Sequence, residues 1–128
     1  MIYGIGTDIV RVSRMQNNLD KYGEKFVNRI LNEKEISDFT RALKKAHFLA
    51  KRFAAKEAVV KAMGTGFRNG VSLDQIIVTH TEHGKPDLEY LGRALKIKEE
   101  LGIGESHLSL SDEEDYAVAF VTLMKASP

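Results

Sequence analysis

The pattern of hydrophobic and polar positions predicts a chain that opens with a strand and continues into helices. β-branched and apolar residues alternate over residues 2–11, which predicts a strand. Ser13, with Gln16 three positions later, matches a capping box at the start of the next helical region. Gly23 is expected to divide that region into two helices. Its apolar positions recur at helical spacing: Leu19, Tyr22, Phe26 and Ile30.

The middle and the end of the chain show both periodicities. Residues 32–43 predict a short helix capped by Asn32, and residues 45–63 predict a longer helix that ends at Gly64. Two strands joined by a hairpin turn, a helix and a second strand pair are expected after it. Their ranges are 73–80, 85–92, 92–102, 106–111 and 116–124. This order predicts an α+β fold with a largely antiparallel sheet and a long central helix, in a single domain spanning 1–128.

Composition excludes several classes of protein. The chain is 43% hydrophobic and 29% charged, which is typical of a globular protein. A net charge of +1 provides no overall attraction to nucleic acid. The absence of cysteine excludes disulfides, thiol nucleophiles and cysteine metal sites. No apolar run approaches the roughly 18 residues of a membrane helix. We therefore expect a cytoplasmic protein with neither nucleic acid nor membrane as a partner.

Charged residues in the long predicted helix suggest chemistry. Glu57 and Lys61 lie one turn apart at the edge of its apolar stripe, beside small residues. The simplest interpretation is an i,i+4 ion pair worth about 0.2–0.5 kcal/mol. Lys56 lies within the same apparently buried segment.

Asp8 adds a second carboxylate in the first strand, on the same face as Gly4 and Gly6. Glycine inside a strand often marks the close approach of a ligand or of another backbone. A carboxylate among apolar residues needs a partner. Asp8 could share a hard cation such as magnesium with Glu57. A salt bridge to Lys56 or Lys61 is the alternative.

Three other features are weaker indications. The glycine-rich segment 64–70 could cradle phosphate through its amides, or only end the helix and turn. His107, Ser109 and Ser111 share one strand face, which suits phosphate or ribose contacts but also a solvated sheet surface. Basic residues near the start suit an acidic partner or form an ordinary solvated helix surface. They are Arg11, Arg14, Lys21, Lys25 and Arg29.

Four segments together resemble a known family, the bacterial holo-acyl-carrier-protein synthases, which are small phosphopantetheinyl transferases. The segments read "GIGTDIVRVSRM", "RFAAKEAVVKAMGTGFRNG", "GKP" and "HLSLSDEEDYAVAFV", in order along nearly the whole chain. The pairing of "GTDIV" with "FxxKExxxK" is specific to that group. The resemblance implies transfer of phosphopantetheine from coenzyme A to a serine of acyl carrier protein, in support of fatty acid biosynthesis. Adenosine 3',5'-bisphosphate is released.

The resemblance also implies roles for individual residues. Asp8 and Glu57 would bind magnesium with the coenzyme A pyrophosphate, and Lys61 would contact the phosphate being transferred. Independently of the resemblance, Glu57 acting through a metal-bound water is our candidate base for the serine proton. Many family members have a second histidine where Asp112 stands, so no imidazole role is expected there. Further matches would bind coenzyme A (Arg52, Gly64, Gly66, His107, Ser109) or dock the acidic carrier protein (Arg14, Lys21, Lys25, Arg29). Homotrimers with active sites between subunits are expected.

Two other functions remain compatible with the residues. The chain could be a non-catalytic module that binds an acidic protein through its basic N-terminal helices. It could also be a metal-dependent phosphohydrolase that releases phosphate or nucleotide without a protein acceptor. Only a transferase would add one phosphopantetheine to a carrier protein.

Overall fold

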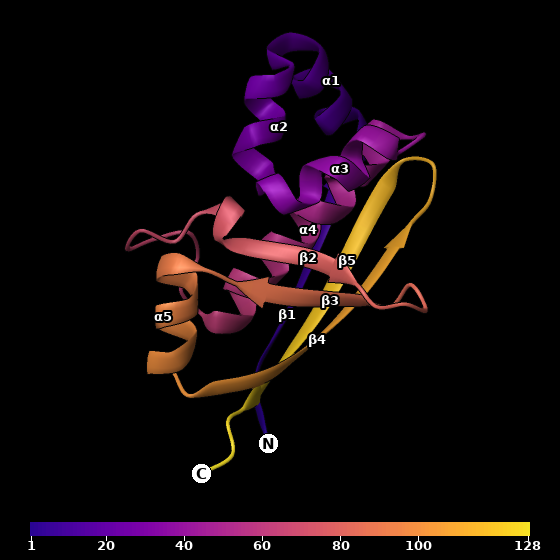
Figure 1. Ribbon diagram of the computed structural model, residues 1–128. Coiled ribbons are helices and arrows are strands. Elements are labelled where there is room, and N and C mark those ends of the chain that lie inside the picture. The colour runs from indigo at the N-terminus through magenta and orange to yellow at the C-terminus, as the bar shows by residue number, and fades with distance from the viewer.

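A computed structural model describes residues 1–128, with helices and strands in the predicted order (Figure 1). The N-terminal half contains β1 (Ile2–Arg11), α1 (Val12–Tyr22), α2 (Glu24–Ile30), α3 (Glu33–Arg41) and α4 (Lys45–Met63). The C-terminal half contains a 3-10 turn η1 (Leu73–Gln75), β2 (Ile76–His80), β3 (Pro86–Tyr90), α5 (Gly92–Glu100), β4 (Ile103–Asp112) and β5 (Tyr116–Lys125). None of the helices combines the length and apolar character that crossing a bilayer requires.

The strands form two antiparallel sheets. One has three strands in the order β1-β5-β4, and the other is the β2-β3 hairpin. Helix α4 packs on one face of the three-stranded sheet, mainly against β1 and β5, and also contacts α1, α2, α3 and β2. In Figure 1, α1 and α2 lie at one end of the molecule, away from the hairpin and α5. The α+β class, the antiparallel pairing and the long central helix are therefore confirmed.

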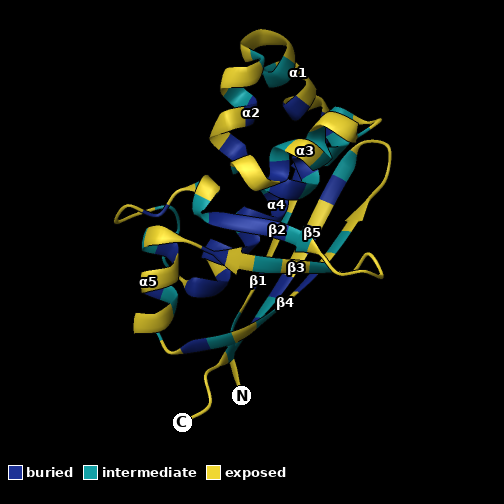
Figure 2. Cartoon of the chain, in the orientation of Figure 1, coloured by how far each residue is buried: buried dark blue, intermediate teal, exposed yellow.

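Helix α4 is buried on more than one side, as the dark blue of the central elements indicates (Figure 2). Four alanines at i,i+4 spacing are at most 5% exposed: Ala50, Ala54, Ala58 and Ala62. Bulky residues on other sides of the helix are buried to the same extent, namely Leu49, Val60 and Met63. The helix therefore lacks the single apolar stripe of a surface helix.

The strand glycines allow β1 to lie directly on the backbone of α4. A Cβ atom on Gly6 would fall 2.0 Å from the Ala58 carbonyl oxygen, and one on Gly4 would fall 2.2 Å from that of Ala62. No side chain fits at either distance. Of the two expected reasons for glycine here, the approach of another backbone is the one found.

Two of the three predicted helix-capping signals are found at the helix ends of the structure. Asn32 caps α3 as predicted: its side chain accepts from the Lys34 amide at 3.0 Å, and Glu35 accepts from the Asn32 amide at 2.9 Å. Gly64 ends α4 with φ of +81°. The predicted Ser13 cap is wrong, because α1 already begins at Val12, directly after β1. The Val12 amide donates to the Asp115 carbonyl at 2.9 Å, so the β4–β5 turn replaces a side-chain cap.

Candidate active site

Asp8 from β1 and Glu57 and Lys61 from α4 form one cluster. The Lys61 Nζ donates to Asp8 Oδ1 at 2.8 Å and to the Thr7 carbonyl at 3.2 Å. The Asp8 side chain is only 15% exposed, whereas that of Lys61 is 53% exposed. Lys61 is therefore the salt-bridge partner of Asp8, and the Lys56 alternative is wrong. The ammonium lies on the solvent side of the pair.

Glu57 is half-buried beside this pair. Burial raises the pKa of the Glu57 carboxyl, and the nearby Asp8 carboxylate raises it further, while Lys61 and Arg14 act in the opposite direction. The two carboxylates are thus close enough to repel one another. The simple i,i+4 ion pair between Glu57 and Lys61 is not formed, because the Lys61 ammonium bonds to Asp8 instead.

The cluster has the donor chemistry of a magnesium site. Magnesium prefers carboxylate oxygens and commonly takes only one or two from the protein, with waters and phosphate oxygens completing its octahedron. Two neighbouring carboxylates repel one another, and a bound dication would remove that repulsion. No group of three or more potential metal ligands occurs in the chain. A magnesium ion here would therefore take two protein ligands, Asp8 and Glu57, and fill its other positions with water and phosphate oxygens.

Arg14 lies at the edge of the cluster as well as on the basic surface. Its guanidinium stands over the Phe53 ring, 5.2 Å from the centroid. Phe53 is one turn before Glu57 on α4, and Arg14 acts to lower the pKa of Glu57. Sequence reasoning assigned Arg14 only to docking and missed this position. The other predicted docking residues, Lys21, Lys25 and Arg29, are exposed on α1 and α2.

A cavity of about 480 Å³ lies between α4, the β2–β3 turn and β4. It brings together the predicted residues Arg52 and Ser109 with cationic groups that sequence reasoning had not selected. The "GKP" segment at residues 84–86, which contributes Lys85 to the lining, was the sequence feature that could have indicated this site. Burial lowers the pKa of the His80 imidazole, and the Arg52 guanidinium lowers it further. The polar lining of the cavity comprises Lys51, Arg52, His80, Lys85, Ser109 and Asp112.

Arg52 itself is nearly enclosed, with its side chain 4% exposed. It donates to Glu35 and to the Val78 carbonyl, both at 3.1 Å, and stands over the Phe48 ring. Part of its hydrogen-bonding capacity is therefore already used inside the protein. Lys51 pairs with Asp112 at 3.8 Å across the same cavity.

His107 and Ser109 do not join the carboxylate cluster within one chain. On the three-stranded sheet, Ser109 lies opposite Phe120, while Asp8 lies opposite Ala119. Neighbouring positions on a strand point to opposite faces. Ser109 and His107 therefore lie on the outer face, and Asp8 lies on the face that contacts α4. His107 also lines a second cavity, of about 570 Å³, beside β3 and α5.

Gly64 and Gly66 follow the cluster directly along the chain. Both have positive φ values, +81° and +63°. The Gly64 amide donates to the carbonyls of Val60 and Lys61, which closes the last turn of α4. The glycines therefore turn the chain immediately after Lys61.

Comparison with known proteins places this geometry in a family. The 4'-phosphopantetheinyl transferase superfamily matches residues 4–121. A holo-acyl-carrier-protein synthase from Nitrosococcus oceani is 55% identical over 124 residues, covering 97% of this chain and 80% of that protein. The crystal structure of the Neisseria meningitidis synthase superposes with a TM-score of 0.91 at 51% identity, covering 98% of this chain and 100% of that one.

A third relative is a Bacillus anthracis holo-acyl-carrier-protein synthase, solved in complex with coenzyme A (3',5'-ADP). It is 38% identical, with a TM-score of 0.81, and covers 99% of both chains. Family match, sequence identity and superposition agree over nearly all residues. The chain therefore belongs to the 4'-phosphopantetheinyl transferase superfamily and, within it, to the holo-acyl-carrier-protein synthases.

Proposed function

We propose that Asp8, Glu57 and Lys61 form the site where this enzyme transfers phosphopantetheine from coenzyme A to a serine of apo acyl carrier protein, with magnesium bound. The observation that carries this assignment is the convergence of two interacting carboxylates and a half-exposed ammonium from β1 and α4. The transfer product is holo acyl carrier protein, and adenosine 3',5'-bisphosphate is released.

The reaction requires stabilisation of phosphate charge. The serine oxygen forms a bond to the phosphorus that carries the pantetheine arm, and the bond from that phosphorus to the bisphosphate breaks. Asp8 and Glu57 would hold magnesium, which supplies positive charge for the pyrophosphate oxygens. Lys61 has its ammonium at the open side of the cluster, where it can donate to a phosphate oxygen as charge builds there.

The serine proton needs an acceptor, and Glu57 is our candidate. A carboxylate that ligates magnesium directly is a weak base, so Glu57 would accept the proton through an intervening water. Arg14, which belongs to the basic surface and also acts on Glu57, would join the docking helices to the reaction site.

We propose that the 480 Å³ cavity receives the nucleotide part of coenzyme A. Lys51, Lys85 and Arg52 provide positive charge for phosphate, and the lowered pKa of His80 favours its neutral imidazole. Ser109 borders the cavity from the edge strand β4. The Bacillus anthracis relative, described with coenzyme A (3',5'-ADP), supports a nucleotide ligand for this fold. Gly64 and Gly66 would let the backbone turn close to the phosphates beside Lys61.

We propose that the enzyme is a homotrimer with active sites between subunits. The outer face of the three-stranded sheet exposes large apolar residues, which is unusual for a surface with no partner. They are Ile5, Ile9, Val118 and Phe120. Because His107 and Ser109 lie on that same outer face, opposite to Asp8, contact with another copy would bring them toward a second copy's carboxylate cluster.

The exposed cations of α1 and α2 form the proposed docking surface for the acidic carrier protein. We define it by Arg14, Lys21, Lys25 and Arg29. Lys25 and Arg29 lie one turn apart on α2. Unlike Arg14, neither of them acts on the pKa of Glu57, so changing these two residues tests docking separately from catalysis.

Reversing the charge of Lys25 and Arg29 together (Lys25→Glu, Arg29→Glu) is expected to weaken carrier-protein binding by at least about tenfold, because two attractive contacts become repulsive. Coenzyme A affinity should stay within about twofold of wild type, since neither residue lies near the cavity. Isothermal calorimetry measures both. Lys96→Glu, an exposed reversal on α5, is the matched control. Unchanged carrier-protein affinity in the double variant would show that α2 is not the dock.

Metal removal tests the reaction itself. Apo carrier protein incubated with the enzyme, coenzyme A and magnesium should gain the mass of one phosphopantetheine, and excess chelator should abolish the gain. A phosphohydrolase would release nucleotide without any gain in protein mass, and a binding module would produce neither product. Full transfer in the presence of chelator, with metal content checked by elemental analysis, would contradict the proposed magnesium site.

A further inference from the structure

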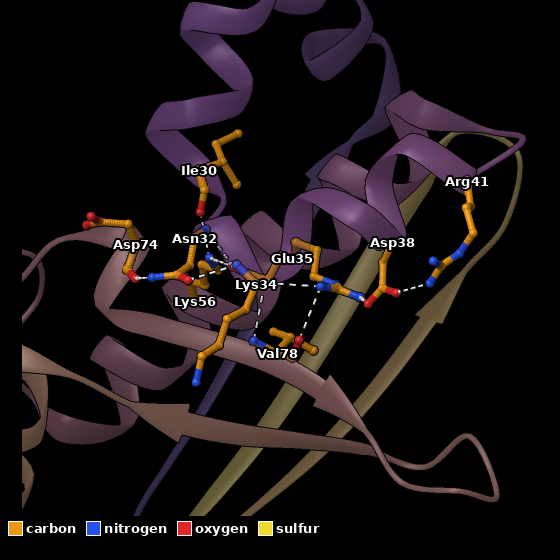
Figure 3. A network of polar contacts seen from close by, with 10 residues as sticks. Ile30, Asn32, Lys34, Glu35, Asp38, Arg41, Lys56, Asp74 and Val78 are labelled. Carbon is orange, nitrogen blue, oxygen red and sulfur yellow. Dashed lines mark hydrogen bonds and ion pairs between the residues drawn. The ribbon is translucent and has the colours of Figure 1, made fainter.

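A buried ion network lies between α4, α3 and β2 (Figure 3). Its three buried charged members are Glu35, Arg52 and Lys56, with 1%, 3% and 0% of their surface exposed. Arg52 also pairs with the more exposed Asp38 at 3.6 Å. Charged side chains are almost never buried to this extent unless they are paired. The reaction proposed above uses neither Glu35 nor Lys56.

Glu35 is the centre of this network. Its carboxylate accepts from Lys56 Nζ at 2.6 Å and Arg52 Nη1 at 3.1 Å, and from the amides of Asn32 at 2.9 Å and Val78 at 3.2 Å. These donors come from α4, from the start of α3 and from β2. One carboxylate therefore ties three elements together.

Lys56 extends the network to a fourth element. Its Nζ also donates to the carbonyl of Ile30, the last residue of α2, at 2.5 Å. Burial lowers the pKa of the Lys56 ammonium, while the Glu35 carboxylate acts against that shift. No buried side-chain polar atom in the protein lacks a partner. The network is thus fully satisfied, which is the condition under which buried charges specify one arrangement.

The position of Lys56 on α4 relates the network to the active site. Successive residues of a helix are about 100° apart, so Lys56 and its neighbour Glu57 point to different sides. Lys56 and Arg52, one turn apart, face α3 and β2. Glu57 and Lys61, one turn apart, face the Asp8 cluster. A small rotation of α4 would therefore move both catalytic side chains away from Asp8.

On its opposite side, α4 meets β1 backbone to backbone. The carbonyls of Ala58 and Ala62 lie where Cβ atoms of Gly6 and Gly4 would fall. This close packing sets the distance between helix and strand. The directional bonds of Lys56 and Arg52 on the other side add a requirement for one rotation of α4.

We propose that Lys56 is a positioning residue for the transfer reaction. Held by Glu35 and the α2 carbonyl, it fixes the rotation of α4 so that Glu57 and Lys61 meet Asp8, and it links the docking helix α2 to the catalytic helix. This inference rests on the proposed roles of Glu57 and Lys61. It assigns to Lys56 no contact with either substrate.

The test is Lys56→Met, which keeps the side-chain length and leaves Glu35 paired with Arg52. The expected kcat is about 10- to 100-fold below wild type, a range typical of misplaced catalytic groups. The KM for carrier protein should change less than about threefold, and the magnesium concentration for half-maximal rate should rise, because the two carboxylates no longer converge. All rates are measured well below the melting temperature of each variant.

Val59→Ala is the matched control, since Val59 is fully buried on the same helix but belongs to no polar contact. It should lower the melting temperature yet keep kcat and magnesium dependence within about twofold of wild type. Lys56→Gln, which retains a donor, should recover part of the loss and replaces Lys56→Met if that variant does not fold. Wild-type kcat and magnesium dependence in the Lys56 variant, or equal losses in Val59→Ala, would overturn the proposal. An active Glu57→Gln enzyme would instead overturn the site assignment itself.

Discussion

Replacing Glu57 with glutamine is expected to lower kcat for phosphopantetheine transfer by at least about 100-fold, with the fold intact. The substitution removes one of two carboxylate ligands and the candidate base. It should not destabilise the protein, because it also removes a half-buried charge and its repulsion with Asp8. Loss of activity and loss of stability are therefore separated in this variant.

Mass spectrometry of the carrier protein measures the transfer, and thermal unfolding followed by circular dichroism measures stability. Glu99→Gln, the same change at an exposed position of α5, should leave both unchanged. Near-wild-type turnover of Glu57→Gln at saturating magnesium would defeat the metal assignment.

Replacing Phe120 with glutamate is expected to dissociate the proposed trimer into folded monomers and to abolish transfer. Phe120 is 47% exposed on the outer face of β5, between Thr7 of β1 and Ser109 of β4. A carboxylate can stay hydrated there in a monomer, so the chain still folds. In a subunit interface the same charge would be buried without a partner, which would destabilise the interface by about 3–5 kcal/mol.

Sedimentation velocity gives the oligomeric state, and the transfer assay gives activity at the same protein concentration. Leu43→Glu places the same charge at a fully exposed apolar position between α3 and α4 and should remain trimeric and active. A monomeric wild-type protein, or a Phe120→Glu variant that transfers phosphopantetheine as a monomer, would refute active sites shared between subunits.

The strands, helices and some helix ends could be predicted from local sequence, because they depend on interactions between residues close together in the chain. Alternation and helical spacing predicted the strands and α-helices in order, and the glycine signal predicted the break at Gly23, where φ is +57°. The strand expected over 73–80 was wrong at its start, because residues Leu73–Gln75 form the 3-10 turn η1. The Asn32 cap and the Gly64 helix end need only neighbouring backbone groups. Asp8, Glu57 and Lys61 were candidates because a carboxylate among small residues needs a counter-charge, and Lys61 supplies it.

Other features depended on segments far apart in the chain. The start of α1 is decided by a carbonyl of the β4–β5 turn, so the local Ser13 signal failed. The partner of Lys56 is Glu35, which no spacing rule relates to α4. The basic cavity joins α4, the β2–β3 turn and β4, and its cations are unremarkable in sequence because only folding places them together.

By itself, the sequence determined the elements, the helix ends set by neighbouring groups and the residue types of the candidate site, because dihedral preference and hydrophobic periodicity act over a few residues. Only the tertiary structure decided which face of the sheet each residue occupies relative to α4 and which charge pairs with which. It therefore also decided that His107 and Ser109 lie on the face opposite to Asp8. Those outcomes depend on strand register and helix rotation, which are set by contacts between residues distant in the chain.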